Sequence, residues 1–284
     1  MIETWADLRS RSLLFEDESV VVLNKPPGIS VTGERHGTDI VQLAKDAGEW
    51  LMPAHRIDKV ASGTVLFAKS ADVHGDITRQ FSRRSVDKAY LVVVGASDLL
   101  GSGTIDLPLS VGRKSRVRVA APRESIAFDA TSGWYTVPPS AVSTDKSVYP
   151  SLTTFVTLSR RERAQLLAVS TVSGRRHQIR VHLAWIGHPI LGDPLFDKHA
   201  AHRTLLHSWC LEVTATWGDG ARRRFEGLPD SSFWSPTDLE PRALDDRAAG
   251  QSLEALAALA TRARSATTPE QARSVPRSRR GSRR

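Results

Sequence analysis

The sequence predicts an α+β fold built on a mixed, mostly antiparallel central sheet with flanking helices. Three observations predict it. Short runs of β-branched and apolar residues recur at 20–23, 64–70 and 89–95, as in strands. Helical patterns are few, and they do not alternate with the strands as βαβ units would. Gly and Pro clusters separate the runs, which favours turns between neighbouring strands.

The first third of the chain predicts strands around one helix. Residues 13–31 (LLFEDESVVVLNKPPGISV) indicate a short apolar piece, an acidic turn and a strand that Pro26-Pro27-Gly28 ends. Strands are also predicted at 64–70 and 89–95. Between these two, Val73, Ile77 and Phe81 recur every four residues, which predicts a helix with a narrow apolar stripe.

The middle of the chain combines strands with an insertion. Residues 110–123 (SVGRKSRVRVAAPR) alternate basic and apolar side chains, which predicts a strand with one cationic face. Residues 136–151 carry three prolines without periodicity, and we interpret them as a loop insertion. Residues 151–159 and 164–174 predict a pair of strands around RRER at 160–163.

A second helix is predicted within RRHQIRVHLAWIGHP, residues 175–189. Gly187 suits a C-terminal cap, and Pro189 follows it. Arg176 and Arg180 lie near the start of this helix, where cations are disfavoured by the helix dipole, so the pattern indicates an anionic partner. Solvated arginines are the alternative. The apolar stripe consists of Ile179, His182, Leu183 and Ile186, and the neighbouring face consists of Arg176, His177 and Arg180.

The character of the chain changes after about Pro236, so we divide it into residues 1–235 and 236–284. The second part predicts a helix at SLEALAALATRAR, followed by a basic tail without fixed structure. Residues 262–284 hold eight arginines and one acid, which accounts for most of the net charge of +8. Evidence for nucleic-acid binding by the body must therefore come from local clusters of basic residues.

Composition narrows the class of protein. Of 284 residues, 40% are hydrophobic and 25% charged, as in ordinary soluble proteins, and the single cysteine excludes an internal disulfide. No apolar run or leader predicts membrane insertion, so we expect a cytoplasmic protein. The oligomeric state stays open at this point, with a monomer as the default expectation. Phosphate-loop, nucleophile-elbow and dinucleotide fingerprints are missing, and the histidine spacing fits no metal site. After these exclusions, the chemistry left to the protein is that of carboxylate and arginine side chains, without a metal or cofactor.

Three residues are candidates for a functional role, but none of them identifies the function by itself. Asp58, in AHRIDKVASG, is by itself most simply a surface carboxylate beside Arg56. Arg180 is by itself a solvated helix arginine or a phosphate clamp. Tyr90, in DKAYLVVV, is by itself a half-buried strand tyrosine.

Together these stretches resemble a known family. HRIDKVASGTVLFAK (55–69) resembles the catalytic motif of RluA-type pseudouridine synthases, and VLNKPPGISV (22–31) resembles the segment before it. KAYLVVVG (88–95), SGRRHQIRVHLAWIGHPILGDPLF (173–196) and RTLLHSWCLEV (203–213) resemble the later motifs. The five motifs keep the family's order across roughly residues 13–235. Small departures occur without loss of a reacting group, namely Ile57, Ala61, Arg176 and Ser208.

The resemblance implies the pseudouridine synthase fold with a central active-site cleft, and an isomerase that converts uridine in rRNA or tRNA to pseudouridine without a cofactor. It implies that Asp58 is the catalytic carboxylate, Arg180 its partner and Tyr90 the residue that stacks on the flipped uracil. A carboxylate kept ionised in a dry pocket needs such a cationic partner. The implied RNA-binding and base-binding residues are His55, Arg56, Arg176, His177 and Leu206.

Two other functions stay open at this point. The first is a non-catalytic RNA-binding protein of the same fold, such as a ribosome assembly factor, which the basic tail would suit. The second is a carboxylate-based RNA glycosylase or nuclease. Basic clusters at 83–84, 113–118, 160–163 and 175–176 predict an RNA groove on the body, or else solvated faces.

Overall fold

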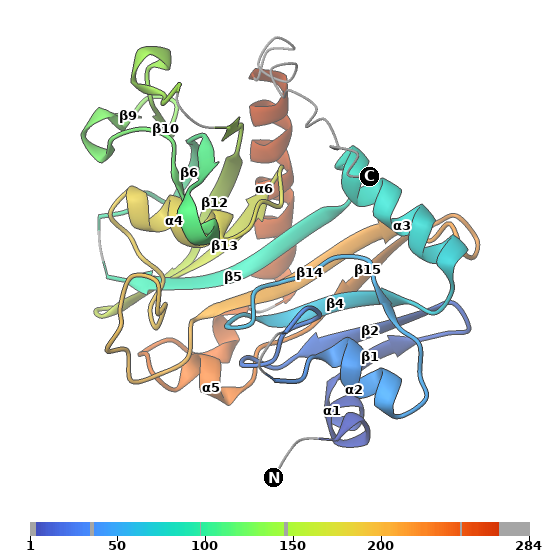
Figure 1. Ribbon diagram of the computed structural model, residues 1–284. Helices are drawn as coiled ribbons and strands as arrows, with labels where there is room; N and C mark the ends of the chain where they lie inside the picture. The colour runs from blue at the N-terminus through green and yellow to red at the C-terminus, as the bar shows by residue number, and fades with distance from the viewer. Residues whose placement is uncertain (1–3, 35–36, 97, 145–146, 245, 267–284) are drawn as a thin grey trace.

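The computed structural model describes residues 4–34, 37–96, 98–144, 147–244 and 246–266 (Figure 1). The basic tail at 267–284 lies outside the described residues. The α-helices are α1 (Trp5–Ser12), α2 (Ile40–Asp46), α3 (Ala71–Arg83), α4 (Gln178–Trp185), α5 (Ser231–Trp234) and α6 (Asp246–Ala266). Short 3₁₀ helices are η1 (Arg113–Ser115), η2 (Arg123–Ser125), η3 (Pro139–Ala141) and η4 (Pro241–Leu244).

The strands are numbered along the chain. The first eight are β1 (Leu13–Glu16), β2 (Val20–Lys25), β3 (Met52–Pro53), β4 (Ser62–Ala68), β5 (Asp87–Gly95), β6 (Ser102–Asp106), β7 (Leu109–Val111) and β8 (Val117–Val119). The others are β9 (Ala127–Asp129), β10 (Trp134–Thr136), β11 (Val148–Tyr149), β12 (Leu152–Arg160), β13 (Ala164–Thr171), β14 (Leu206–Thr214) and β15 (Arg222–Glu226).

Most of these strands join one large sheet. Its order is β1-β2-β4-β14-β5-β13-β12-β6-β10-β9, with β15 beside β14 and β3 beside β4. Within the described residues, only the pairs β4–β14 and β6–β10 are parallel. A small second sheet has the order β11-β7-β8. The predicted α+β class, with a mixed and mostly antiparallel sheet, is confirmed.

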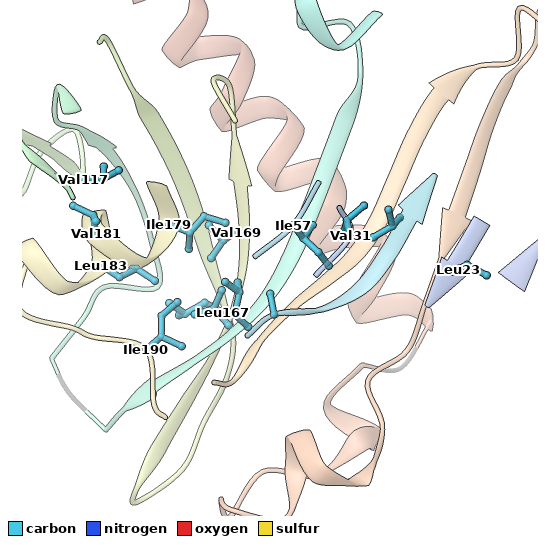
Figure 2. Packing of buried hydrophobic residues seen from close by; sticks show 14 of the residues in the cluster. Leu23, Val31, Ile57, Val117, Leu167, Val169, Ile179, Val181, Leu183 and Ile190 are labelled. Carbon is cyan, nitrogen blue, oxygen red and sulfur yellow. The ribbon is translucent and has the colours of Figure 1, made fainter. Parts of the chain in front are cut away.

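Strand β5 runs through the middle of the sheet and separates two hydrophobic clusters. Because successive strand residues face opposite sides, Val92 and Val94 join one cluster while Leu91 and Val93 join the other. The first cluster includes Ile57 and packs helix α4 onto the sheet (Figure 2). The second lies on the opposite face, under helix α6 (Figure 1). The candidate site therefore belongs to the α4 side of the sheet.

Helix α3 forms where the spacing predicts it. Ile77 is fully buried, and Val73 and Phe81 pack beside it against β2 and β4. Ser70 caps the first turn by accepting a hydrogen bond from the Val73 amide. The helix ends at Arg84, which adopts the left-handed backbone conformation with φ of 59°.

Helix α4 is shorter than the sequence predicts. It begins at Gln178, because His177 adopts a left-handed conformation with φ of 55°, which no α-helix continues. The prediction that Arg176 and His177 lie on the helix is therefore wrong, since both belong to the turn before it. The predicted end is confirmed by Gly187, whose φ of 96° follows the last turn.

The segment 110–123 is also different from the prediction of one cationic strand. Its chain reverses between β7 and β8, where the Gly112 amide donates to the Arg116 carbonyl at 2.8 Å. Ser115 there adopts φ of 56°. Alternation holds only in β8, where exposed Arg118 stands between buried Val117 and Val119. The chain turns back here because Val117 and Val119 of β8 pack in the same cluster as Val181 of α4.

The insertion at 136–151 is mostly irregular, as predicted, although η3 and the short β11 lie within it. The strand pair β12 and β13 is confirmed, with antiparallel pairing from Thr153 opposite Thr171 to Arg160 opposite Gln165.

Helix α6 is the C-terminal helix that the sequence predicts. It packs against β12 and β13, with Leu256 buried in the same cluster as Leu239. Residues 236–266 therefore continue the hydrophobic body. Among the described residues, no helix has the length and apolar character that crossing a bilayer requires.

Helix α4 is fixed to its neighbours by His182, which is fully buried. Its Nε2 lies 2.9 Å from the Leu107 carbonyl and its Nδ1 lies 2.9 Å from Thr153 Oγ1. Because a carbonyl only accepts, Nε2 carries the proton and Nδ1 accepts from the threonine hydroxyl. Burial lowers the pKa of His182 to about 4, so this imidazole is neutral at pH 7.

Acid should therefore destabilise the protein through its buried histidines. The unfolded chain takes up a proton near pH 6.5, whereas folded His182 does so only near its lowered pKa of about 4. The contribution to stability is complete above pH 6.5 and is lost as the pH falls towards 4. We expect His182→Gln to remove about 2 kcal/mol of the decrease in unfolding free energy between pH 6.5 and pH 4.5. Urea titrations at the two pH values measure this, and equal decreases in variant and wild type would contradict it.

Candidate active site

A cavity of about 710 Å³ opens on the α4 side of the sheet. Its walls come from the loop 54–61, the end of α3, strand β5, the turn 171–177, the start of α4 and the start of β14. All eight residues predicted for the site line this cavity, although they span 151 positions of sequence between the first and the last. They are His55, Arg56, Asp58, Tyr90, Arg176, His177, Arg180 and Leu206.

The centre of the site is an ion pair between Asp58 and Arg180. Arg180 Nη1 donates to Asp58 Oδ2 at 2.8 Å. Asp58 lies in loop 54–61 and Arg180 lies on helix α4, so the ion pair connects these two segments. The side chain of Asp58 is 22% exposed, whereas that of Arg180 is 4% exposed. The carboxylate therefore faces the cavity while its cationic partner lies in the wall behind it.

Arg180 is also held from behind by Asp193. Its Nε donates to Asp193 Oδ2 at 2.8 Å and its Nη2 donates to Asp193 Oδ1 at 2.6 Å, which is a bidentate pair. Burial alone would lower the pKa of Arg180, but the carboxylates of Asp193 and Asp58 outweigh it and raise that pKa. One buried guanidinium thus bridges two carboxylates, and only Asp58 reaches the cavity.

The packing around Asp58 and Arg180 fixes their positions. Ile57 and Ile179, the residues immediately before them, are both buried in the cluster shown in Figure 2. Because both neighbours are anchored in the same core, the ion pair is carried by two rigid segments.

Tyr90 stands on β5 in the wall of the cavity. Its strand neighbours are Val169 on β13 and Ser208 on β14. Burial raises the pKa of the Tyr90 hydroxyl, and the negative charge of Asp58 raises it further. The phenol therefore stays protonated at pH 7 and presents an aromatic ring beside the carboxylate.

His177 is the residue that turns the chain into α4. Its Nε2 lies 3.7 Å from Asp58 Oδ1, the oxygen that does not accept from Arg180. Burial lowers the pKa of His177, and Asp58 opposes this effect. The turn is secured by buried Gln178, whose Oε1 accepts from Ser173 Oγ at 2.8 Å and from the Arg175 amide at 3.0 Å.

The other predicted residues occupy different parts of the rim and wall. Arg56 and Arg176 are exposed at the cavity, and Arg176 Nη1 lies 3.5 Å from the Ser115 carbonyl. Leu206 is 5% exposed where β14 begins. His55 accepts a hydrogen bond from the Leu66 amide at 3.1 Å and stacks on Phe81, with ring centroids 4.9 Å apart. Burial lowers the pKa of His55 to about 3, so a neutral imidazole ties the loop to β4.

The loop that carries Asp58 is anchored where it enters β4. Lys25 is fully buried, and its Nζ donates to the carbonyls of Pro26, Ile29 and Ala61 at 2.8, 2.9 and 2.6 Å. Immediately after Ala61, Ser62 Oγ lies 2.7 Å from His207 Nδ1 and accepts from Arg203. These hydrogen bonds hold loop 54–61 between β2 and β14.

The chemistry of the site relies on residues that sequence reasoning did not select. Asp193 lies in the ILGDPLF part of the fourth motif, and Lys25 in the NKPPG part of the first. Both are fully buried charged residues. Their positions inside the family motifs could have indicated a functional role. Nothing in the local sequence shows that Asp193 contacts Arg180, or that Lys25 contacts the loop that carries Asp58.

The comparisons with known proteins point to one family. The family model for RNA pseudouridylate synthase matches residues 19–185. Ribosomal large subunit pseudouridine synthase D of Nitrosomonas europaea is 30% identical over 221 residues, covering 71% of this chain and 57% of that protein. The dual-specificity RNA pseudouridine synthase RluA of Pasteurella multocida is 32% identical over 200 residues, covering 68% of this chain and 81% of that protein.

A solved structure shares the fold. Human RNA pseudouridylate synthase domain containing 4 has a TM-score of 0.64 and 24% identity, and the match covers 81% of this chain and 92% of that one. The family match spans β2 to α4 and so includes Asp58, Tyr90 and Arg180. The chain belongs to the RNA pseudouridylate synthase family, and it is of the RluA type.

Proposed function

We propose that this protein converts uridine in RNA to pseudouridine, with Asp58 as the catalytic carboxylate. The observation that carries the proposal is the ion pair at 2.8 Å between half-buried Asp58 and buried Arg180, at the wall of a cavity large enough for a nucleoside. Membership of the family supports the reaction type.

The reaction is an isomerisation, so it needs no oxidant and no co-substrate. The C1′–N1 bond breaks, the uracil turns, and a C1′–C5 bond forms. C5 loses its hydrogen as a proton, and N1 gains one. Asp58 acts as nucleophile or base on the nucleoside while the glycosidic bond is open. Arg180 holds this carboxylate in place through the charge-assisted hydrogen bond at 2.8 Å.

The remaining residues of the cavity bind and orient the substrate. Tyr90 stacks on the uracil ring from one side, and Leu206 packs against it from the other. The protonated Tyr90 hydroxyl is also available for proton transfer. Exposed Arg56 and Arg176 hold the RNA backbone at the rim, while His177 and His55 shape the wall around Asp58.

The target uridine must leave its stack to reach Asp58, because a stacked nucleotide hides its glycosidic bond. We infer that the substrate is a structured rRNA or tRNA, since relatives are named for ribosomal and for transfer RNA. We further propose that the protein acts in the cytoplasm as a monomer, without metal or cofactor, and that residues 1–235 form the catalytic domain. A non-catalytic RNA-binding role has no support in a site that retains Asp58, Tyr90 and Arg180.

The proposal is tested with RNA labelled with tritium at C5 of uridine. The RNA is isolated from cells in which the gene has been deleted and is incubated with the purified protein. Because C5 becomes the glycosidic carbon, each isomerisation releases its tritium to water. We expect release that stops at a fixed number of uridines per RNA. Intact label, or free uracil or cleaved strands in place of released tritium, would overturn the proposal.

A further inference from the structure

One wall of the cavity carries three cations that the chemistry at Asp58 does not use. Arg84 ends helix α3, Lys88 lies on β5, and Arg175 lies in the turn before α4. All three line the cavity. They are brought together from three separate segments, so their proximity is a property of the fold.

The two arginines line the same cavity and act on each other as like charges. The guanidinium of Arg175 is fixed over the ring of Tyr149, with Cζ 4.8 Å from the ring centroid. Burial lowers the pKa of Arg175, and the charge of Arg84 lowers it further. Among the described residues, no carboxylate forms an ion pair with either guanidinium, whereas Arg222 pairs with both Asp87 and Glu212. An anion between them would relieve this repulsion.

Lys88 lies on β5 and lines the same cavity. It lies two residues before Tyr90, so both side chains project from the same face of β5, while Asp87 projects from the other face and pairs with Arg222. Lys88 Nζ lies 5.9 Å from the centroid of the Phe81 ring. Within the part of the chain that the structure describes, it has no hydrogen-bond or carboxylate partner. Burial lowers the pKa of Lys88 to about 8, so the ammonium is still charged at pH 7.

Gly174 makes room for this ammonium. A Cβ atom at position 174 would lie 3.0 Å from Lys88 Nζ, closer than such atoms normally approach. The turn before α4 is thus shaped to bring the backbone next to Lys88 and to present Arg175 beside it.

We propose that Arg84, Lys88 and Arg175 form a subsite for a phosphodiester of the RNA strand next to the target uridine. The inference deepens the proposed function and rests on it. Residues two apart on a strand are about 6.6 Å apart, so Lys88 lies within one nucleotide of the ring of Tyr90. A phosphodiester suits the subsite because arginine pairs bind phosphate oxygens through several charge-assisted hydrogen bonds.

The cations of the subsite are electrostatically separate from the ion pair of Asp58 and Arg180. The charge of Asp58 acts on Tyr90 and His177 and is balanced by Arg180. The cations of the subsite have no such balance, so they are free to attract an anion. A phosphate bound there would anchor the strand while the uracil enters the space between Tyr90 and Leu206.

The subsite is tested by the salt dependence of binding to a twelve-residue oligouridylate at pH 7. We expect the double variant Arg84→Gln, Arg175→Gln to bind about tenfold more weakly at 0.1 M salt. The slope of log K against log salt should become shallower by about 0.7, the share of one phosphate on a single strand. Lys88→Met should weaken binding in the same direction. Arg79→Gln is the matched control, since Arg79 lies on the same helix α3 but pairs with Asp76.

A second measurement tests whether the oligouridylate binds next to Arg175. The chain has three tyrosines, so 3-fluorotyrosine gives three fluorine resonances, assigned by single Tyr→Phe variants. The resonance of Tyr149, under Arg175, should shift when the oligouridylate is added to the labelled wild type, and should not shift in the double variant. Equal affinity and slope in wild type and double variant would overturn the subsite.

The subsite and the proposed function fail in distinguishable ways. If the wild type releases tritium but the double variant binds the oligouridylate like the wild type, the subsite is wrong and the isomerase stands. If no tritium is released but the double variant loses affinity and slope as expected, the phosphate subsite stands and the isomerase is wrong.

Discussion

Replacing Asp58 with asparagine is expected to reduce the single-turnover rate of pseudouridine formation by at least about 10³-fold, because the amide can neither attack nor accept a proton. RNA binding should change little, since the cations that line the cavity with Asp58 remain. The measurement is tritium release from pre-bound RNA, with binding followed separately.

Two controls separate chemistry from structure in this prediction. Asp58→Glu keeps the charge but moves the carboxylate, so it should also lose most of the rate. Asp72→Asn changes an exposed carboxylate on α3 and should leave the rate unchanged. A rate for Asp58→Asn within tenfold of the wild type would show that another group performs the chemistry.

Replacing Asp193 with alanine is expected to lower the free energy of unfolding by about 3–5 kcal/mol, because it leaves the buried guanidinium of Arg180 with half of its partners. Asp193 is fully buried, and its Oδ1 also accepts from the Leu195 amide at 2.9 Å. Activity should fall together with stability, since Arg180 positions Asp58. Urea denaturation followed by fluorescence measures the change.

The matched control for Asp193 is a surface ion pair of the same chemistry. Asp76 pairs with Arg79 on α3, and its side chain is 39% exposed. Asp76→Ala should therefore cost less than about 1 kcal/mol. If Asp193→Ala cost no more than Asp76→Ala, the bidentate pair would not be what holds Arg180.

The sequence predicts the fold class from local patterns, and it predicts the centre of the site from motifs that resemble those of a known family. Strand runs such as 89–95 and the four-residue spacing in α3 are local. The motifs around Asp58, Tyr90 and Arg180 are local as well, and their common cavity follows from the family's fold. All eight predicted residues line that cavity.

What could not be predicted depends on contacts between distant segments. The helix start at Gln178 follows from the left-handed turn at His177, which Gln178 holds through contacts with Ser173 and the strand β12. The chain reversal at 112–116 follows from packing against α4. The role of Asp193 requires knowing that Arg180 faces both it and Asp58, and no spacing in the sequence contains that information.

The most direct test of the central claim is pseudouridine mapping in three strains, namely the deletion strain, and the deletion strain complemented with wild type or with Asp58→Asn. The account predicts that wild type restores one or a few pseudouridines missing from the rRNA or tRNA of the deletion strain, and that Asp58→Asn, at equal abundance, restores none. Restoration of the same sites by Asp58→Asn would contradict the claim that the carboxylate held by Arg180 performs the isomerisation.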